Sequence, residues 1–248
     1  MLLQPLFRMT NSMHSLSRNR IICRDANCGF TLVELAIVLL IVTLLLGGLL
    51  PTVSSQIEQQ RRNDTRKQIE EIRQALFGFA IINGRLPCPT NQPDPANPNY
   101  GSEDPALCAT EGYLPWKTLG VSETDAWGSR RSAVADPWTG YWRYRADRNF
   151  SVGTITLITG FGTCSPLSSD CMTIQDSNGL ALTNTTERPV AIVYSTGPNL
   201  IADPNNASFE AVGGIYQSDT PNPAFDDILI WISRPQLFNR MVTAGKLP

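Results

Sequence analysis

The chain has 248 residues, 20 Lys and Arg against 22 Asp and Glu, and a formal net charge of −2. This length fits one sizeable domain together with a membrane element, and the lack of a basic surplus gives no indication of a nucleic-acid-binding protein. The only histidine is His14, and the sequence contains no C-x-x-C, P-loop or H-E-x-x-H motif. We therefore expect a protein that is not an enzyme.

The segment 30–50 is apolar, and Glu34 is its only charged residue. Its 21 residues match the roughly 20 that an α-helix needs to cross a bilayer. Four arginines and one aspartate precede it, which predicts a cytoplasmic N-terminus and an exported remainder. A secretory signal peptide fits less well, because its apolar core runs about 7–15 residues and ends in a small-residue cut site. A plain signal anchor remains open on these grounds.

A carboxylate in such a span is costly unless it finds a partner. A cut after Gly29 would create an α-amino group on Phe30, and this cation could pair with Glu34 of a neighbouring subunit. The run GFTLVE at 29–34 resembles the prepilin peptidase site of type IV pilins and type II secretion pseudopilins. The resemblance covers residues 29–51 and implies cleavage after Gly29, N-methylation of Phe30 and subunit docking through Glu34.

Beyond Pro51 the pattern predicts a continuing amphipathic helix. Its apolar residues recur at steps of three and four, and Asn83-Gly84 ends the run; they are Ile69, Ile72, Leu76, Phe79 and Ala80. We expect the charged stretch 58–71 to be a solvated face with i,i+4 pairs. The chain thus divides into a leader (1–29), a transmembrane half (30–51) and a periplasmic half (52–82) of one helix, a Pro-rich connection (83–135) and a β-sheet head (136–248).

Four β-like runs follow, separated by Gly, Pro, Asn and Asp clusters: Tyr141–Arg145, Thr154–Thr159, Val190–Tyr194 and Ile228–Ile232. A short helix is expected over Gln236–Ala244. A long helix followed by strands close in sequence predicts an α+β fold, with an antiparallel sheet packed on the helix.

Four cysteines lie on the exported side, where the environment is oxidising: Cys88, Cys108, Cys164 and Cys171. They allow three pairings, of which we favour Cys88–Cys108 and Cys164–Cys171, because each would close one irregular loop. Free buried thiols remain the alternative.

The head carries a second resemblance. DPWTGYWRY at 136–144, YSTGPN at 194–199 and DDI at 226–228 follow the order seen in the major pseudopilin of type II secretion. The resemblance implies a calcium site at Asn199, Asp226 and Asp227, and flexible acid-bearing loops can supply the oxygens that Ca²⁺ needs. Asn199 stands where the family usually has an acid. The alternative is that both aspartates are turn residues beside a strand, so that no cofactor binds.

Arginines and aromatic residues alternate near the first strand, and such a set could bind nucleic acid: Arg130, Arg131, Trp138, Tyr141, Trp142, Arg143, Tyr144, Arg145 and Arg148. We favour a half-buried strand, with Tyr141, Arg143 and Arg145 on one face and Trp142 and Tyr144 on the other.

These observations predict a minor pilin or pseudopilin of a type IV pilus or type II secretion filament, with a DNA-uptake or adhesive module as the alternative. The expected partners are prepilin peptidase, other pilin or pseudopilin subunits, the inner-membrane assembly platform and membrane lipid. The expected location is the inner membrane with a periplasmic head, and then the filament.

Overall fold

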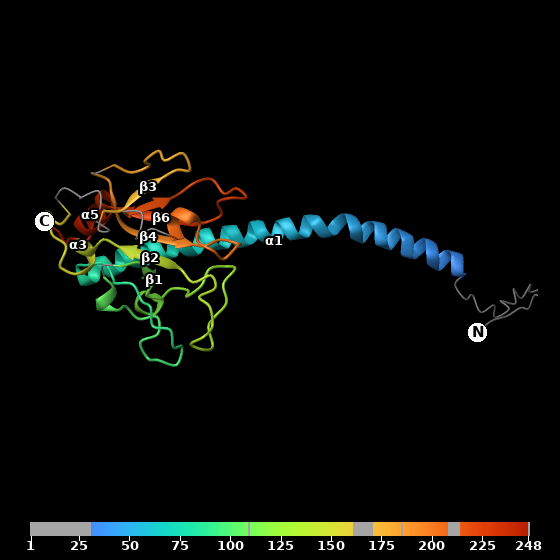
Figure 1. Ribbon diagram of the computed structural model, residues 1–248, viewed down its shortest axis with the longest axis horizontal. Helices are drawn as coiled ribbons and strands as arrows, with labels where there is room; N and C mark the ends of the chain where they lie inside the picture. Colours follow the sequence, from blue (N-terminus) through green and yellow to red (C-terminus); the bar gives the residue numbers. More distant parts are fainter. Residues whose placement is uncertain (1–30, 109, 161–170, 185, 208–213, 248) are drawn as a thin grey trace, which may run out of the picture. The chain divides into compact units, whose positions relative to one another are not determined.

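The computed structural model describes residues 31–108, 110–160, 171–184, 186–207 and 214–247 (Figure 1). The chain divides into two compact units, Met1–Pro51 and Thr52–Pro248. The described part of the first unit is the beginning of helix α1, which spans Leu32–Asn83 and continues into the second unit.

Helix α1 begins and ends with recognisable capping signals. At its start, the side-chain hydroxyl of Thr31 accepts the backbone N–H of Glu34 at 3.2 Å. At its end, Gly84 adopts φ +69°, and its N–H donates to the carbonyl of Ala80 at 2.8 Å. Glycine occupies this left-handed position without the steric penalty of a Cβ. The predicted stop at Asn83-Gly84 is therefore confirmed.

In the second unit, α1 contributes one apolar face to the main core. Four of the five predicted core residues are almost fully buried, namely Ile69, Ile72, Leu76 and Ala80. The prediction was wrong for Phe79, which is only half-buried and lies under the guanidinium of Arg85 at 5.5 Å. Phe77, which was not predicted, is buried in the main core instead.

A four-stranded antiparallel sheet lies against this face of α1. Its order is β1 (Gly112–Tyr113), β2 (Arg143–Ala146), β4 (Pro189–Ser195) and β6 (Ile228–Ser233). The predicted α+β class is thus confirmed. Side chains of β2, β4 and β6 enter the same core as α1, among them Tyr144, Val190, Val193 and Ile232, and so does Trp142 directly before β2.

The predicted strand Thr154–Thr159 is wrong. The N–H of Ile155 donates to the carbonyl of Gly84 at 2.7 Å, so this backbone pairs with the chain that leaves α1 rather than with a strand. Thr156 and Thr159 then close a turn through their backbone and hydroxyl groups. Of the three apolar side chains here, only that of Ile155 is buried, and a solvated turn results.

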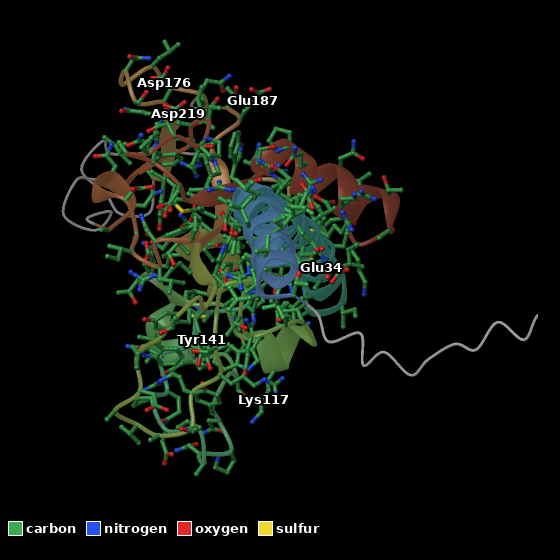
Figure 2. The ribbon with its side chains drawn as sticks, turned by 90° about the vertical axis from the view of Figure 1, so that its right-hand side faces the viewer. Glu34, Lys117, Tyr141, Asp176, Glu187 and Asp219 are labelled. Atoms are coloured by element: carbon green, nitrogen blue, oxygen red, sulfur yellow. A yellow bond between two sulfur atoms is a disulfide. The ribbon has the colours of Figure 1, made fainter. Side chains whose placement is uncertain are left out.

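A second sheet covers the other face of the first. It consists of two parallel strands, β3 (Thr173–Gln175) and β5 (Ile215–Gln217). Asp176 and Asp219 follow these strands and lie together at one end of the head, where Asp219 accepts the N–H of Ser177 (Figure 2). Because the second sheet covers one face of β4 and the main core covers the other, all seven residues of β4 are buried.

Short helical segments fill the connections: η1 (Pro105–Leu107), α2 (Trp116–Leu119), α3 (Arg148–Ser151) and α4 (Pro204–Ala207). The predicted C-terminal helix is α5, Arg234–Thr243. It begins two residues earlier than predicted, because Ser233 and Gln236 form a reciprocal capping box at its start. Leu237 and Met241 of α5 are buried in the main core.

Candidate functional site

The first unit presents an apolar helix surface with one carboxylate. Eleven large apolar side chains between Leu32 and Leu45 have exposed fractions of 42–87%. Glu34 lies in the first turn of α1 (Figure 2), and its carboxylate has no hydrogen-bond or ion-pair partner within the described parts of the chain. The predicted cleavage residues, Gly29 and Phe30, lie outside the described residues.

Among the residues that the structure describes, no helix combines the length and the hydropathy that a membrane span requires.

In the head, three carboxylates converge between the β4–α4 loop and the start of β6. They belong to Asp203, Asp226 and Asp227, and one oxygen from each lies within 4.8 Å of the others. Asp203 accepts the backbone N–H groups of Asp226 and Asp227 at 3.0 and 3.2 Å. Asp227 in turn accepts the N–H of Asp203 and the side-chain amide of Asn206. Backbone amides therefore hold the three acids together.

The chemistry of this cluster fits a hard cation. Burial, with the neighbouring Asp203 and Asp226 carboxylates, raises the pKa of Asp227 to about 7, although hydrogen bonds from Asn206 and Asp203 oppose the shift. Burial and Asp203 likewise raise the pKa of Asp226. One oxygen of each of these two residues is buried and accepts no hydrogen bond. A cation at this point would neutralise the cluster and give both oxygens a partner.

The structure brings together two of the three predicted calcium ligands. Asp226 and Asp227 belong to the cluster, but the side-chain oxygen of Asn199 accepts the N–H of Ile201 at 2.7 Å and serves a turn. The backbone N–H of Asn199 donates to Asp226. The third acid is Asp203, which we did not predict. Its position directly before Pro204, between the two segments already singled out, was the available signal.

A buried ionic network lies elsewhere in the head, and sequence reasoning missed it. The Glu111 side chain is only 5% exposed and forms an ion pair with Arg143, whose Nε also donates to it at 2.8 Å. The hydroxyls of Tyr194 and Tyr216 donate to the same carboxylate at 3.1 and 2.6 Å. Burial lowers the pKa of Arg143, but the Glu111 carboxylate outweighs it and the pKa rises. Through Glu111, which directly precedes β1, the network joins β2, β4 and β5.

The arginine and aromatic set is largely internal. Tyr141, Trp142 and Tyr144 are buried, and so is Arg145, which corrects the predicted half-buried strand. The second sheet and the Glu111 network cover the face that was expected to meet solvent.

Neighbouring side chains also cover the Trp138 ring. Tyr113 stacks on it at 3.9 Å, and the Arg131 guanidinium lies 4.1 Å from its ring centroid. Arg131 donates to two backbone carbonyls. These side chains stabilise the head and do not form a stacking surface for bases.

The cysteines stabilise the connection that follows α1. Cys88 and Cys108 form a disulfide, as in the pairing we favoured, and both are buried. The bond fastens the chain beyond α1 to the segment after η1. Cys171 is also disulfide-bonded, whereas Cys164, its predicted partner, lies outside the described residues.

Comparison with protein families gives one match. Residues 24–50 match the model described as the prokaryotic N-terminal methylation motif. No curated protein and no solved structure matches the chain. The matched segment includes Gly29, Phe30 and Glu34 and covers the exposed apolar residues of α1 between Leu32 and Leu45. The motif implies processing by prepilin peptidase, membrane anchoring and assembly with other pilin subunits. The chain therefore carries the N-terminal signature of type IV pilins and pseudopilins, joined to an α+β head.

Proposed function

We propose that this protein is a structural subunit, a minor pilin or pseudopilin, of a type IV pilus or type II secretion filament. The exposed apolar start of α1, with Glu34 as its single acid, is the observation that carries the proposal. Such a surface is unfavourable in water and needs lipid or other helices around it. The chain is anchored in the inner membrane with its head in the periplasm, and the assembly platform then transfers it into the filament.

Cleavage between Gly29 and Phe30 supplies the counter-charge for Glu34. The carboxylate is costly in an apolar environment, and the new amine of Phe30 on a neighbouring subunit neutralises it only when the helices are packed together. This pairing sets the axial register of the helices. A carboxylate that is destabilising in the isolated subunit thereby favours assembly.

N-terminal mass analysis of membrane-extracted protein tests the processing step, and the mature chain should begin with methylated Phe30. Glu34→Gln tests the docking step, because it keeps the shape of the side chain and removes its charge. Cleavage should continue, whereas incorporation into filaments should fall sharply and processed protein should accumulate in the membrane. Glu34→Asp should give an intermediate level. Wild-type incorporation of Glu34→Gln would refute the docking role.

We also propose that Asp203, Asp226 and Asp227 hold a calcium ion in the head. The ion would supply positive charge that offsets the mutual repulsion of the three carboxylates and fixes two loops at the start of β6. The buried oxygens without hydrogen bonds support this assignment.

Calcium titration of the full chain in detergent, followed by calorimetry, should show one site. Asp227→Asn should abolish this site, whereas Asp219→Asn should leave it unchanged, because that acid lies outside the cluster and accepts N–H groups in a turn. Equal calcium binding by wild type and Asp227→Asn would contradict the assignment.

A further inference from the structure

A groove between α1 and α5 is lined by hydrogen-bond donors. It has a volume of about 360 Å³, and its principal lining residues are Arg73, Gln74 and Phe77 from α1 and Gln236, Asn239 and Arg240 from α5. The lining residues from both helices belong to the second unit, and Leu237 and Met241 of α5 are buried in the same core as the apolar face of α1. The groove is therefore a fixed feature of the head, with two guanidinium groups on its lining.

The acceptors near the groove are already occupied. The side-chain oxygen of Gln236 accepts the N–H of Ser233 at 3.1 Å. That of Asn239 accepts the hydroxyl of Thr243 at 3.2 Å. Glu70 accepts both Arg73 and Gln74, each through one nitrogen.

Donors remain in excess. The Nε atom of Arg73 is buried and has no hydrogen-bond partner among the described residues. The Arg240 guanidinium lies 5.5 Å from the Phe77 ring centroid, and no carboxylate of the described chain forms an ion pair with it. An unsatisfied buried donor is costly, and two guanidinium groups with one carboxylate between them leave positive charge uncompensated. The chemistry that completes the groove is an anion with several acceptor oxygens.

We propose that the groove binds an acidic segment, one bearing Asp or Glu side chains, of a neighbouring filament subunit. Arginine recognises planar carboxylates through paired N–H groups, and the two helices present such donors along one groove. Without the residues before Phe30, the chain has 16 basic and 21 acidic residues, so copies of it and subunits of similar charge offer acidic surface. That the segment belongs to a filament subunit rests on the proposed function, whereas the preference for carboxylates follows from the groove itself.

The preference of the groove can be tested apart from assembly. Fluorescence anisotropy would measure binding of labelled hexaglutamate and hexaglutamine peptides to the full chain in detergent at low ionic strength. We expect binding of hexaglutamate only, weakened about tenfold or more by Arg240→Glu and by the milder Arg240→Gln. Arg148→Glu makes the same charge change at an exposed residue of α3 and should have little effect. Equal binding by the Arg240→Glu and Arg148→Glu variants would overturn the proposal.

The partner can be identified in cells. A photo-crosslinking amino acid at Asn239 of the full chain should crosslink to an acidic segment of a filament subunit, and Arg240→Glu should reduce this product about tenfold while leader cleavage continues. A crosslink to lipid alone, or an unchanged product in Arg240→Glu, would overturn the assigned partner. If the wild-type chain were never cleaved or incorporated, the proposed function would fail, and the peptide titration would still decide the chemistry of the groove.

Discussion

Replacing Glu111 by glutamine tests the buried ionic network of the head. Four donor groups from Arg143, Tyr194 and Tyr216 converge on its two oxygens, and its side chain is 5% exposed. Glutamine has a similar size but no charge, and one of its two terminal atoms is a donor. The variant would therefore leave Arg143 without its counter-ion and at least one buried donor without an acceptor.

The cost can be estimated from these contacts. Breaking a buried ion pair by removing one partner costs about 3–5 kcal/mol. Arg143 is 31% exposed, so water offsets part of this loss and the lower half of the range applies. A decrease of about 3 kcal/mol in the free energy of unfolding corresponds to a fall of roughly 6–12 °C in Tm for a domain of this size.

Urea unfolding of the full chain in detergent, followed by tryptophan fluorescence, would measure the change. Glu123→Gln is the matched control, because Glu123 pairs with Arg130, whose side chain is 84% exposed. That variant should cost less than about 1 kcal/mol. The reasoning would be refuted if Glu111→Gln were no more destabilising than Glu123→Gln.

Three further outcomes are expected from unfolding experiments. Replacing Cys88 and Cys108 by serine should cost about 3 kcal/mol, because the open loop regains conformational freedom when unfolded. A reducing agent should lower the free energy of unfolding more for the wild type than for this variant, which keeps the Cys171 disulfide. Leu76→Ala should cost about 2–5 kcal/mol in urea titrations, since this side chain is fully buried. The Asp227 pKa is about 7 in the folded state against 3.8 ordinarily, so without calcium the wild type should lose stability as pH rises between these values. The slope should be at most about 1.4 kcal/mol per pH unit, and Asp227→Asn should remove that slope.

Local patterns predicted those parts of the fold that depend on neighbouring residues. The three- and four-residue steps of Ile69, Ile72 and Leu76 determine the buried face of α1, and Gly84 determines its end. The runs that became β4 and β6 are apolar and β-branched, so their conformation could be predicted without knowledge of their partners.

Features that depend on distant pairing were missed. β3 and β5 pair in parallel, although β4 lies between them in the sequence. Neither three-residue segment has a pattern from which its partner could be predicted. The role of Glu111 likewise follows only from the positions of Tyr194 and Tyr216, about 80 and 105 residues later. The place of Asp203 in the acidic cluster could not be predicted either, because its backbone contact with Asp227 depends on the folded loop.

The main core joins the first and last elements of the second unit. Ile69 and Ile72 belong to its first helix, whereas Leu237, Met241 and Leu247 belong to its last residues. During synthesis, the apolar face of α1 therefore emerges long before the residues that cover it, and the core cannot close until α5 has been made. A chain that ends early, even by the length of α5, would expose the hydrophobic residues that proteases and chaperones recognise. Synthesis of α5 is thus a condition for a closed core.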